Sequence, residues 1–293
     1  MFEIRPRRSV LYMPGANERA MDKARALPAD AIIIDLEDAV APEAKEAARA
    51  QVKAAVTQGG YGHREVVIRV NALDTPWGEA DLAMAAEATP DAVLIPKVSD
   101  PETLNAVGLR LRKHGAPEKV RVWAMIETPL AILRCEEIAR AARDVDARLA
   151  CLVLGTNDLA KETRARQVPG RAPILPWLSI AVAAARAHDL DILDGVYNQL
   201  QDDEGFRAEC AQGRDLGFDG KTLIHPNQIG PANEIFSPTP AEVEEARGII
   251  AAFERPENQG KGVISLNGRM VERMHADIAT RIVALAEAIA RQG

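Results

Sequence analysis

The amino-acid sequence predicts a (β/α)8 TIM barrel, a closed ring of parallel strands covered by helices. Eight short apolar runs each end at a turn, a polar residue or a charged residue, and segments with helical patterning separate them. A strand–helix alternation repeated eight times is typical of this barrel, and 293 residues leave room for a C-terminal extension. Reactive residues of such barrels lie at the C-terminal ends of the strands. The polar residues that follow the apolar runs are therefore the candidate active site.

The predicted strands are short, apolar and spaced along the first three quarters of the chain. In order they are Val10–Met13, Ala31–Ile34, Val66–Ile68, Ala92–Ile95, Val122–Ile126, Cys151–Leu154, Ile192–Val196 and Thr222–Ile224. Between them, Asn17 is expected to cap a helix that runs to about Leu27. Prolines are expected at or just before the first position of three further helices, at Pro42, Pro101 and Pro129. The segment Lys161–Pro176 is expected to be a long loop on the active face.

The pattern changes after the eighth strand, where a C-terminal helical extension is expected. Thr239–Glu242 forms a predicted capping box at the start of a helix. Pro256–Gly268 is rich in Pro, Gly and Asn and is expected to be a hinge or loop, and Met270–Ala290 is expected to be a helix with one apolar stripe. The predicted domains are a barrel over residues 1–236 and a lid extension over residues 237–293, which packs on the barrel or on a neighbouring subunit.

Composition excludes several classes of function. A net charge of −7 and an aromatic content of 4% argue against nucleic-acid binding, which requires basic patches and stacking residues. The three cysteines lack metal or redox spacing, and Cys151 is expected to be buried in a strand. No apolar run approaches the roughly 20 residues that span a membrane, and the N-terminus does not resemble a signal peptide. We therefore expect a cytoplasmic protein with no membrane partner.

Carboxylates follow three of the predicted strands, and a barrel would bring them to one pocket. They are Asp35, Glu37, Asp38, Glu127 and Asp158. Oxygen ligands without His or Cys neighbours suit Mg²⁺, with Mn²⁺ as the alternative metal. Glu127 and Asp158 are expected to be direct ligands because each is expected to follow its strand immediately, whereas Glu37 and Asp38 are expected to hold metal-bound waters. The alternative for a single acid such as Asp158 is a helix cap or a solvated loop residue.

Arg69 follows a run that should be buried, so its guanidinium is expected to meet an anion at the mouth of the barrel. A planar guanidinium binds a substrate carboxylate through two parallel hydrogen bonds. The alternative is an internal salt bridge to Glu37 or Glu127, which the substrate could replace.

Two further features carry weaker signals. Arg19 and Lys23 lie four residues apart after the Pro14–Asn17 turn, where a helix N-terminus and two cations could bind phosphate, although a solvated basic face is the commoner arrangement. His225 is expected to order its loop through a hydrogen bond to the backbone.

Five motifs together resemble the citrate lyase β-subunit family, the acyl-CoA lyase branch of the HpcH/HpaI aldolase superfamily. This branch includes malyl-CoA lyases, citramalyl-CoA lyases and malyl-CoA thioesterases. The resemblance extends from about Arg8 to about Ala290, and its motifs are Arg8–Gly15, Asp35–Pro42, Ile68–Asn71, Asp194–Asn198 and Gly220–Pro226.

The resemblance implies a Mg²⁺-dependent enzyme that acts on a hydroxy-dicarboxylyl-CoA thioester, with CoA as part of the substrate. It implies that Arg69 binds the substrate carboxylate and that Glu127 and Asp158 bind the metal. It also implies a homotrimer or hexamer in which the C-terminal segment covers a neighbour's site. The lid motif of the family ends in aspartate, whereas Gly268–Glu272 ends in glutamate here. The residues that the resemblance implies for CoA binding are Tyr12, Pro14, Arg19 and Lys23.

Two reactions fit this arrangement, and the sequence favours the first. In carbon–carbon cleavage, a metal-bound hydroxyl loses its proton, malyl-CoA or citramalyl-CoA splits into acetyl-CoA and an α-oxo acid, and Glu272 of a neighbour protonates the enolate. In thioester hydrolysis, Glu272 directs water at the thioester carbonyl of malyl-CoA.

Two different roles remain open beside these reactions. The chain could be the β subunit of a citrate lyase complex that acts on an acyl-carrier thioester. It could also be a non-catalytic CoA-binding protein, but Arg69, Glu127 and Asp158 argue against that role because a purely structural barrel has no need of them.

Overall fold

The structure is a computed structural model that describes residues 4–292. The chain forms two compact units. One comprises residues 7–233, and the other comprises residues 234–292 together with residues 4–6. Within the described residues, no helix has the length and apolarity needed to cross a membrane.

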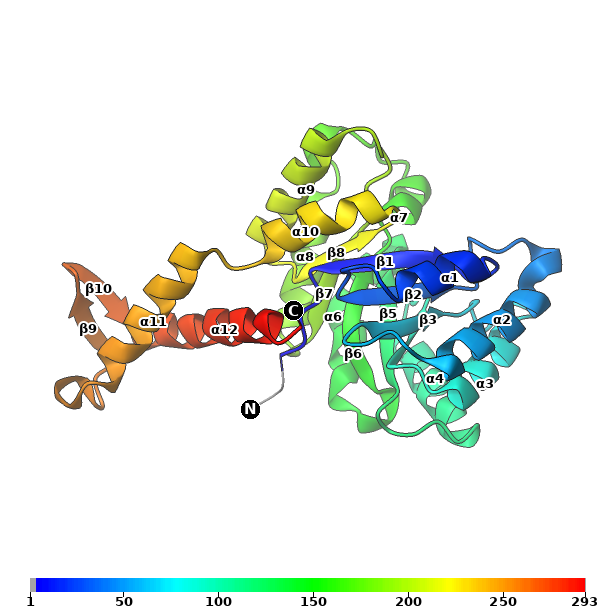
Figure 1. The fold of residues 1–293 in the computed structure, drawn as a ribbon, viewed down its shortest axis with the longest axis horizontal. Coiled ribbons are helices and arrows are strands. Elements are labelled where there is room, and N and C mark those ends of the chain that lie inside the picture. Colours follow the sequence, from blue (N-terminus) through cyan, green and yellow to red (C-terminus); the bar gives the residue numbers. More distant parts are fainter. Residues whose placement is uncertain (1–3, 293) are drawn as a thin grey trace. The chain divides into compact units, whose positions relative to one another are not determined.

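Residues 7–233 form a closed barrel of eight parallel strands in sequential order, in which β8 pairs with β1 (Figure 1). This confirms the predicted (β/α)8 TIM barrel, and all eight predicted strands are present. The strands are β1 (Ser9–Pro14), β2 (Ala31–Asp35), β3 (Glu65–Arg69), β4 (Ala92–Ile95), β5 (Arg121–Ile126), β6 (Leu149–Leu154), β7 (Asp191–Asp194) and β8 (Gly220–Leu223).

Helices connect the strands and cover the outside of the barrel (Figure 1). They are α1 (Glu18–Ala24), α2 (Lys45–Gln58), α3 (Gly78–Ala88), α4 (Pro101–Lys113), α5 (Pro129–Leu133), α6 (Cys135–Arg140), α7 (Thr156–Thr163), α8 (Leu175–Arg186), α9 (Asp203–Leu216) and α10 (Ile229–Phe236). The start signals are confirmed. Asn17 caps α1, Pro101 and Pro129 open α4 and α5, and Pro42 opens a short 3₁₀ turn before α2.

The inside of the barrel explains why charged residues meet at one end. Alternate residues of the strands, such as Ile33, Val67 and Met125, pack together in the core of the barrel. Side chains two positions apart on a strand point the same way, so the next inward-facing positions are Asp35, Arg69 and Glu127. The apolar core thus ends in a layer of charged groups at the C-terminal ends of the strands, as expected for the active end of this fold.

The opposite end of the barrel is closed by a buried ion-pair cluster centred on Arg7. Its guanidinium donates to both carboxylate oxygens of Glu65 at 2.7 and 2.8 Å, pairs with Asp191, and lies 5.1 Å from the centre of the Trp123 ring. The side chains of Arg7 and Glu65 are only 11% and 3% exposed. Because this end of a TIM barrel carries stability and not catalysis, we assign the cluster a structural role.

Replacing Arg7 by methionine is expected to destabilise the barrel by about 3–5 kcal/mol, because it leaves the buried Glu65 carboxylate without its main partner. Chemical unfolding measures this change. The matched control is Arg112→Met, since the Arg112–Asp146 ion pair is 56% and 43% exposed and should contribute less than about 1 kcal/mol. Equal stability of both variants would contradict the structural role of Arg7.

The C-terminal unit pairs two helices with a β-hairpin. It contains α11 (Pro240–Glu254), β9 (Val263–Leu266), β10 (Arg269–Glu272) and α12 (Arg273–Ala290), and α11 packs against α12. The predicted capping box is confirmed, since Thr239 and Glu242 exchange hydrogen bonds at 2.7 and 3.2 Å.

The expectation of a hinge or loop over Pro256–Gly268 is wrong in its second half, and the last helix begins at Arg273 instead of Met270. Asn267 and Gly268 both have positive φ angles, 53° and 77°, and join β9 to β10 in a two-residue turn. Asn-Gly between apolar runs is a strong hairpin signal because both residues tolerate these angles. Ile264 and Val271 face the small core of this unit.

Candidate active site

A cavity of about 360 Å³ opens at the C-terminal ends of the barrel strands. It brings together six residues that were predicted to be functional for different reasons: Tyr12, Pro14, Asp38, Arg69, Glu127 and Asp158. Asp35 also lines it. The ends of β2, β3 and β5 and the first turn of α7 therefore converge at one cavity.

Arg69 is buried and already paired within the protein. Asp35 lies opposite it in the register of β2 and β3, and accepts from Nε and Nη2 of Arg69 at 2.6 Å each. The remaining nitrogen, Nη1, lies 2.9 Å from a Glu37 oxygen and 3.5 Å from an Asp38 oxygen. The predicted internal salt bridge is present, with Asp35 as its main partner and Glu37 as the second. The predicted pairing with Glu127 is absent from the ion pairs of residues 4–292.

The electrostatics of Arg69 follow from these contacts. Burial alone would lower its pKa, but the Asp35 hydrogen bonds and the nearby Tyr12 and Glu37 raise it well above its usual value. The guanidinium also lies 5.0 Å from the centre of the Tyr12 ring. Arg69 is thus a permanent cation whose side toward Glu37 is the part that can exchange partners.

Buried side chains hold the backbone of the loop that carries Glu37 and Asp38. Asp35 accepts from the backbone nitrogens of Glu37 and Ala39 at 2.9 Å each. The buried Lys45 donates to the carbonyls of Leu36 and Glu37 at 2.9 Å each. Burial raises the pKa of Glu37 to about 6, against the opposing effect of Arg69. The Glu37 carboxylate is thus engaged by cations, and Asp38 is the more exposed of the two acids.

Glu127 is held on two sides within the cavity. Its Oε1 accepts from the backbone nitrogen of Lys97 at 2.7 Å. On its other side, a Cβ added to Gly155 would lie 2.3 Å from Oε2 and 2.4 Å from the Cβ of Glu127, so only glycine leaves room for this side chain. Burial raises the pKa of Glu127 to about 8, and the charges of Glu37 and Asp158 add to the rise.

Asp158 lies in the first turn of α7 and not directly after β6, which corrects the sequence expectation. The capping alternative is also wrong, because Gly155 is the N-cap and no side chain caps α7. No hydrogen bond of the Asp158 side chain is present within residues 4–292. Its carboxylate therefore faces the cavity as an available oxygen ligand.

The donor set fits a hard divalent cation. Within the described residues, no three His, Cys, Asp or Glu side chains group as a metal site, so a site with many protein ligands is not indicated. Mg²⁺ needs only one or two carboxylates and takes its other oxygens from water and substrate. Glu127 and Asp158 provide such a pair, and a cation between them would relieve the repulsion that raises the pKa of Glu127.

The residues implied for CoA divide into two groups. Tyr12 and Pro14 line the cavity, and burial raises the pKa of Tyr12 above its usual value. Arg19 and Lys23 are exposed on α1 and do not line the cavity. The Ala20 backbone nitrogen, one of the donors expected to be free at this helix start, donates to Asn17 Oδ1 at 3.0 Å. The helix start therefore offers less to a phosphate than the sequence suggested.

Glu272 lies at the junction of β10 and α12 and is exposed. Its side chain accepts a hydrogen bond from the backbone of the first turn of α12, and its backbone nitrogen donates to His275 Nδ1 at 2.9 Å. Glu272 thus caps its own helix in the C-terminal unit. His225 orders its loop as expected, accepting from the Asn227 backbone nitrogen at 3.2 Å.

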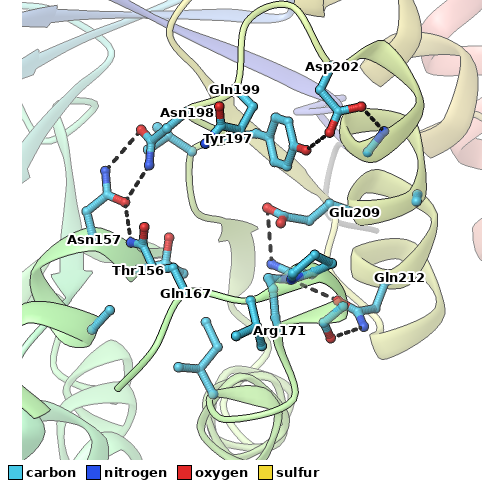
Figure 2. A pocket seen from close by; sticks show the side chains of 18 of the residues that line it. Thr156, Asn157, Gln167, Arg171, Tyr197, Asn198, Gln199, Asp202, Glu209 and Gln212 are labelled. Atoms are coloured by element: carbon cyan, nitrogen blue, oxygen red, sulfur yellow. Dashed lines mark hydrogen bonds and ion pairs between the residues drawn. The ribbon is translucent and has the colours of Figure 1, made fainter. Parts of the chain in front are cut away.

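A second cavity of about 350 Å³ adjoins the first and shares Thr156, Asn157, Val196 and Asn198 with it. Figure 2 shows Asn157 and Asn198 facing each other with reciprocal hydrogen bonds at 2.8 and 3.2 Å. Residues 166–171 of the loop predicted over Lys161–Pro176 line this cavity, but the loop is shorter than expected, because α7 runs to Thr163 and α8 begins at Leu175.

Beneath the second cavity lies a buried charge cluster that was not predicted from the sequence. Lys221 is fully buried and donates to Asp194 at 2.9 Å and to Glu209 at 2.7 Å. Arg171 donates to the same Asp194 at 2.7 Å (Figure 2 shows it beside Glu209). Burial would raise the pKa of Asp194, but Lys221 and Arg171 hold it below its usual value. The available signal was the presence of the charged residues Asp194 and Lys221 within two short barrel strands.

Lys97 was also missed. It follows β4 and Pro96, and its ammonium lies 3.7 Å from Glu37 Oε1. Only the apolar run Ala92–Ile95 was assigned a role there, although a lysine directly after a barrel strand carried the same signal as Arg69. The cysteines contribute no chemistry, because Cys135, Cys151 and Cys210 are buried and unpaired, as expected for Cys151.

Comparison with known proteins agrees with this geometry. Residues 8–226 match the family model described as HpcH/HpaI aldolase/citrate lyase. The chain is 51% identical over 288 residues to (3S)-malyl-CoA thioesterase of Cereibacter sphaeroides (strain KD131 / KCTC 12085), covering 98% of this chain and 97% of that protein. It is 36% identical over 290 residues to citrate lyase subunit beta of Escherichia coli (strain K12), covering 97% and 95% of the two chains.

Among solved structures, CitE from Mycobacterium tuberculosis in complex with magnesium, acetoacetate and coenzyme A superposes with a TM-score of 0.76 and 25% identity, covering 96% of this chain and 98% of that one. The barrel, the carboxylates at its C-terminal end and these matches agree, and the chain belongs to the HpcH/HpaI aldolase/citrate lyase family of enzymes.

Proposed function

We propose that this enzyme hydrolyses the CoA thioester of a short hydroxy-dicarboxylic acid, with malyl-CoA as the model substrate, and that it requires Mg²⁺. The observation that carries the proposal is the placement of Glu127 and Asp158 beside Arg69 in one cavity. The 51% identity to malyl-CoA thioesterases over nearly the whole chain supports hydrolysis ahead of the carbon–carbon cleavage favoured by the sequence alone.

In this proposal Glu127 and Asp158 hold Mg²⁺, or Mn²⁺ in its place. The metal, when bound, supplies positive charge that polarises oxygens of the substrate. Glu127 is fixed for this role by the Lys97 backbone nitrogen and by the space at Gly155. Tyr12 and Pro14 form the wall at the end of β1 and contact the acyl-CoA substrate. Arg19 and Lys23, exposed on α1, attract the phosphates of CoA from outside the cavity.

Arg69 binds the substrate carboxylate through its Nη1 side, where Glu37 is the present partner. Asp35 keeps the other two donors and so fixes the plane of the guanidinium. The carboxylates of Glu37 and Asp38 would then be free to accept hydrogen bonds from water bound to the metal. This exchange retains a paired charge in both states, which avoids leaving a buried cation without a partner.

Hydrolysis requires a base for the attacking water, and Glu272 of a neighbouring subunit is the candidate. Water adds to the thioester carbonyl carbon while one of its protons passes to the carboxylate. The carboxyl group then returns that proton to the sulfur as the carbon–sulfur bond breaks, which gives the free acid and CoA thiol. A homotrimer or hexamer would deliver this residue. Exposed apolar side chains flank it and would suit an interface: Val263, Met270, Met274 and Ile278.

Carbon–carbon cleavage is the second candidate, because the 36% identity to citrate lyase β subunits places that chemistry on the same scaffold. One assay separates the two reactions. With malyl-CoA and Mg²⁺, hydrolysis releases a free thiol in equal amount to malate and no glyoxylate, whereas cleavage releases glyoxylate and no thiol. We expect thiol release that EDTA abolishes. Glyoxylate in stoichiometric amount would establish the lyase instead. If neither thiol nor glyoxylate were released, malyl-CoA would not be a substrate and the proposal would be overturned.

Replacing Gly155 by alanine tests the packing of Glu127. The added Cβ would overlap the Glu127 side chain, so the carboxylate must move away from its present position. We expect Mg²⁺ affinity, measured by calorimetry, to fall at least about tenfold, the size of a displaced metal-orienting group. Gly248→Ala, where a Cβ has open space around it, is the control. Unchanged Mg²⁺ binding in Gly155→Ala would contradict the role of Glu127.

A further inference from the structure

Lys97 has a backbone conformation that is unusual for its residue type. Its φ is +53°, in the left-handed region that glycine and asparagine adopt more readily than lysine. Such conformations persist where the surroundings enforce them, and they cluster at functional sites. Here the backbone nitrogen of Lys97 donates to Glu127 Oε1 at 2.7 Å, which accounts for the conformation of the main chain. It does not account for the choice of lysine, since glycine would donate the same hydrogen bond.

The side chain of Lys97 lies among the acids of the active site. Its Nζ is 3.7 Å from Glu37 Oε1, and the side chain is 49% exposed. Partial burial would lower the pKa of Lys97, but the charges of Glu37, Glu127, Asp158 and Asp38 raise it. The ammonium is therefore a cation within the field of the same two carboxylates that would hold the metal.

The ammonium of Lys97 is free to change its position in a way that the guanidinium of Arg69 is not. Arg69 is held by both oxygens of Asp35 and its side chain is only 8% exposed. The ammonium of Lys97 has one ion pair at a distance longer than a hydrogen bond, on a flexible four-carbon stem. Of these two cations at the mouth of the barrel, Lys97 is the one that can move when a ligand enters.

The charges around the cavity explain how a movement of Lys97 would affect metal and substrate binding. Four acids, Asp35, Glu37, Asp38 and Asp158, face the two cations Arg69 and Lys97, besides Glu127, whose raised pKa of about 8 keeps it largely protonated near neutral pH until a cation binds. The excess negative charge attracts a divalent cation and repels an acidic substrate. An ammonium near Glu127 and Asp158 also opposes metal binding, because both cations occupy the same field.

We propose that Lys97 is an exchanging cation of the active site: it neutralises the acids when the site is empty, and it binds the substrate carboxylate together with Arg69 once the metal is bound. This proposal rests on the proposed function for the metal at Glu127 and Asp158 and for the acidic substrate. It adds a substrate-binding residue, and it predicts that one substitution changes the affinity for the metal and the affinity for the substrate in opposite directions.

The test is Lys97→Gly, which keeps the backbone nitrogen for Glu127 and suits the positive φ, and removes only the ammonium. Calorimetry measures Mg²⁺ binding to the protein alone and malate binding at saturating Mg²⁺. We expect Mg²⁺ to bind about three- to fivefold more tightly and malate at least three- to fivefold more weakly. These changes in affinity correspond to the free energy of about one partly exposed ion pair. Lys97→Arg should restore both affinities toward those of the wild-type protein.

Arg164→Gly is the matched control, because Arg164 is an exposed cation that also has a positive φ, +60°, but has no ion pair with an acid of the active site within residues 4–292. It should change neither affinity. If Lys97→Gly weakens the binding of both Mg²⁺ and malate, or leaves both affinities unchanged, the proposed role of Lys97 as an exchanging cation is overturned while the proposed function stands. If the wild-type protein binds no Mg²⁺, the proposed function fails and Lys97 loses its role with it.

Discussion

Asp158→Asn is expected to lower turnover of malyl-CoA by roughly 10³-fold and to leave the fold intact. The amide keeps the size of the side chain but removes a negative charge from the pair that would hold Mg²⁺, and a bound metal contributes several kcal/mol to transition-state stabilisation. Asp158 makes no side-chain hydrogen bond within residues 4–292 and caps no helix, so its loss should not disturb α7. Steady-state kinetics over a Mg²⁺ titration measure the effect.

Asp146→Asn provides the comparison, because Asp146 is exposed and precedes β6, at the other end of the barrel from the cavity. It should retain wild-type turnover. Full activity of Asp158→Asn, after EDTA treatment, at the Mg²⁺ concentration that half-saturates the wild-type protein would show that Asp158 is not a metal ligand. Recovery at high Mg²⁺ would instead place the whole effect on metal affinity, in agreement with the assignment.

Glu272→Gln is expected to lower turnover by about 10²–10⁴-fold, the range of a general acid–base group, and to leave substrate binding nearly unchanged. Glutamine can still accept the hydrogen bond that caps α12, so the hairpin and helix should remain folded. Kinetics give the turnover, and calorimetry with malate gives the binding. Wild-type turnover in this variant would remove Glu272 from the mechanism.

A mixing experiment tests whether Glu272 acts across subunits. Subunits with Glu272→Gln and subunits with Asp158→Asn are each expected to be inactive. After subunit exchange, some interfaces would combine an intact metal site with an intact Glu272, and part of the activity should return. Exchange confirmed by mass spectrometry without any recovery would show that Glu272 acts within its own chain or takes no part.

The barrel could be predicted because its signal is repeated and local. Each apolar run and each helix-start residue, such as Asn17 and Pro101, acts within a few positions of itself. The hairpin at Asn267 and Gly268 has an equally local signal in this dipeptide, although the Pro, Gly and Asn content of Pro256–Gly268 is also typical of a loop.

The partners within the site could not be predicted in the same way. Arg69 was expected to meet Glu37 or Glu127, but the register of β2 and β3 places Asp35 directly opposite it. Register depends on how all eight strands close, which no local pattern contains. The cradle that Gly155 forms for Glu127 likewise depends on the close approach of two connections after β5 and β6.

The most direct measurement is a crystal structure of the protein grown with Mn²⁺ and malate, with anomalous scattering used to locate the metal. We expect one strong peak bound by both the Glu127 and Asp158 carboxylates, with the malate carboxylate beside Arg69. A metal bound elsewhere, or a site at which neither carboxylate coordinates it, would contradict the assignment of the active site.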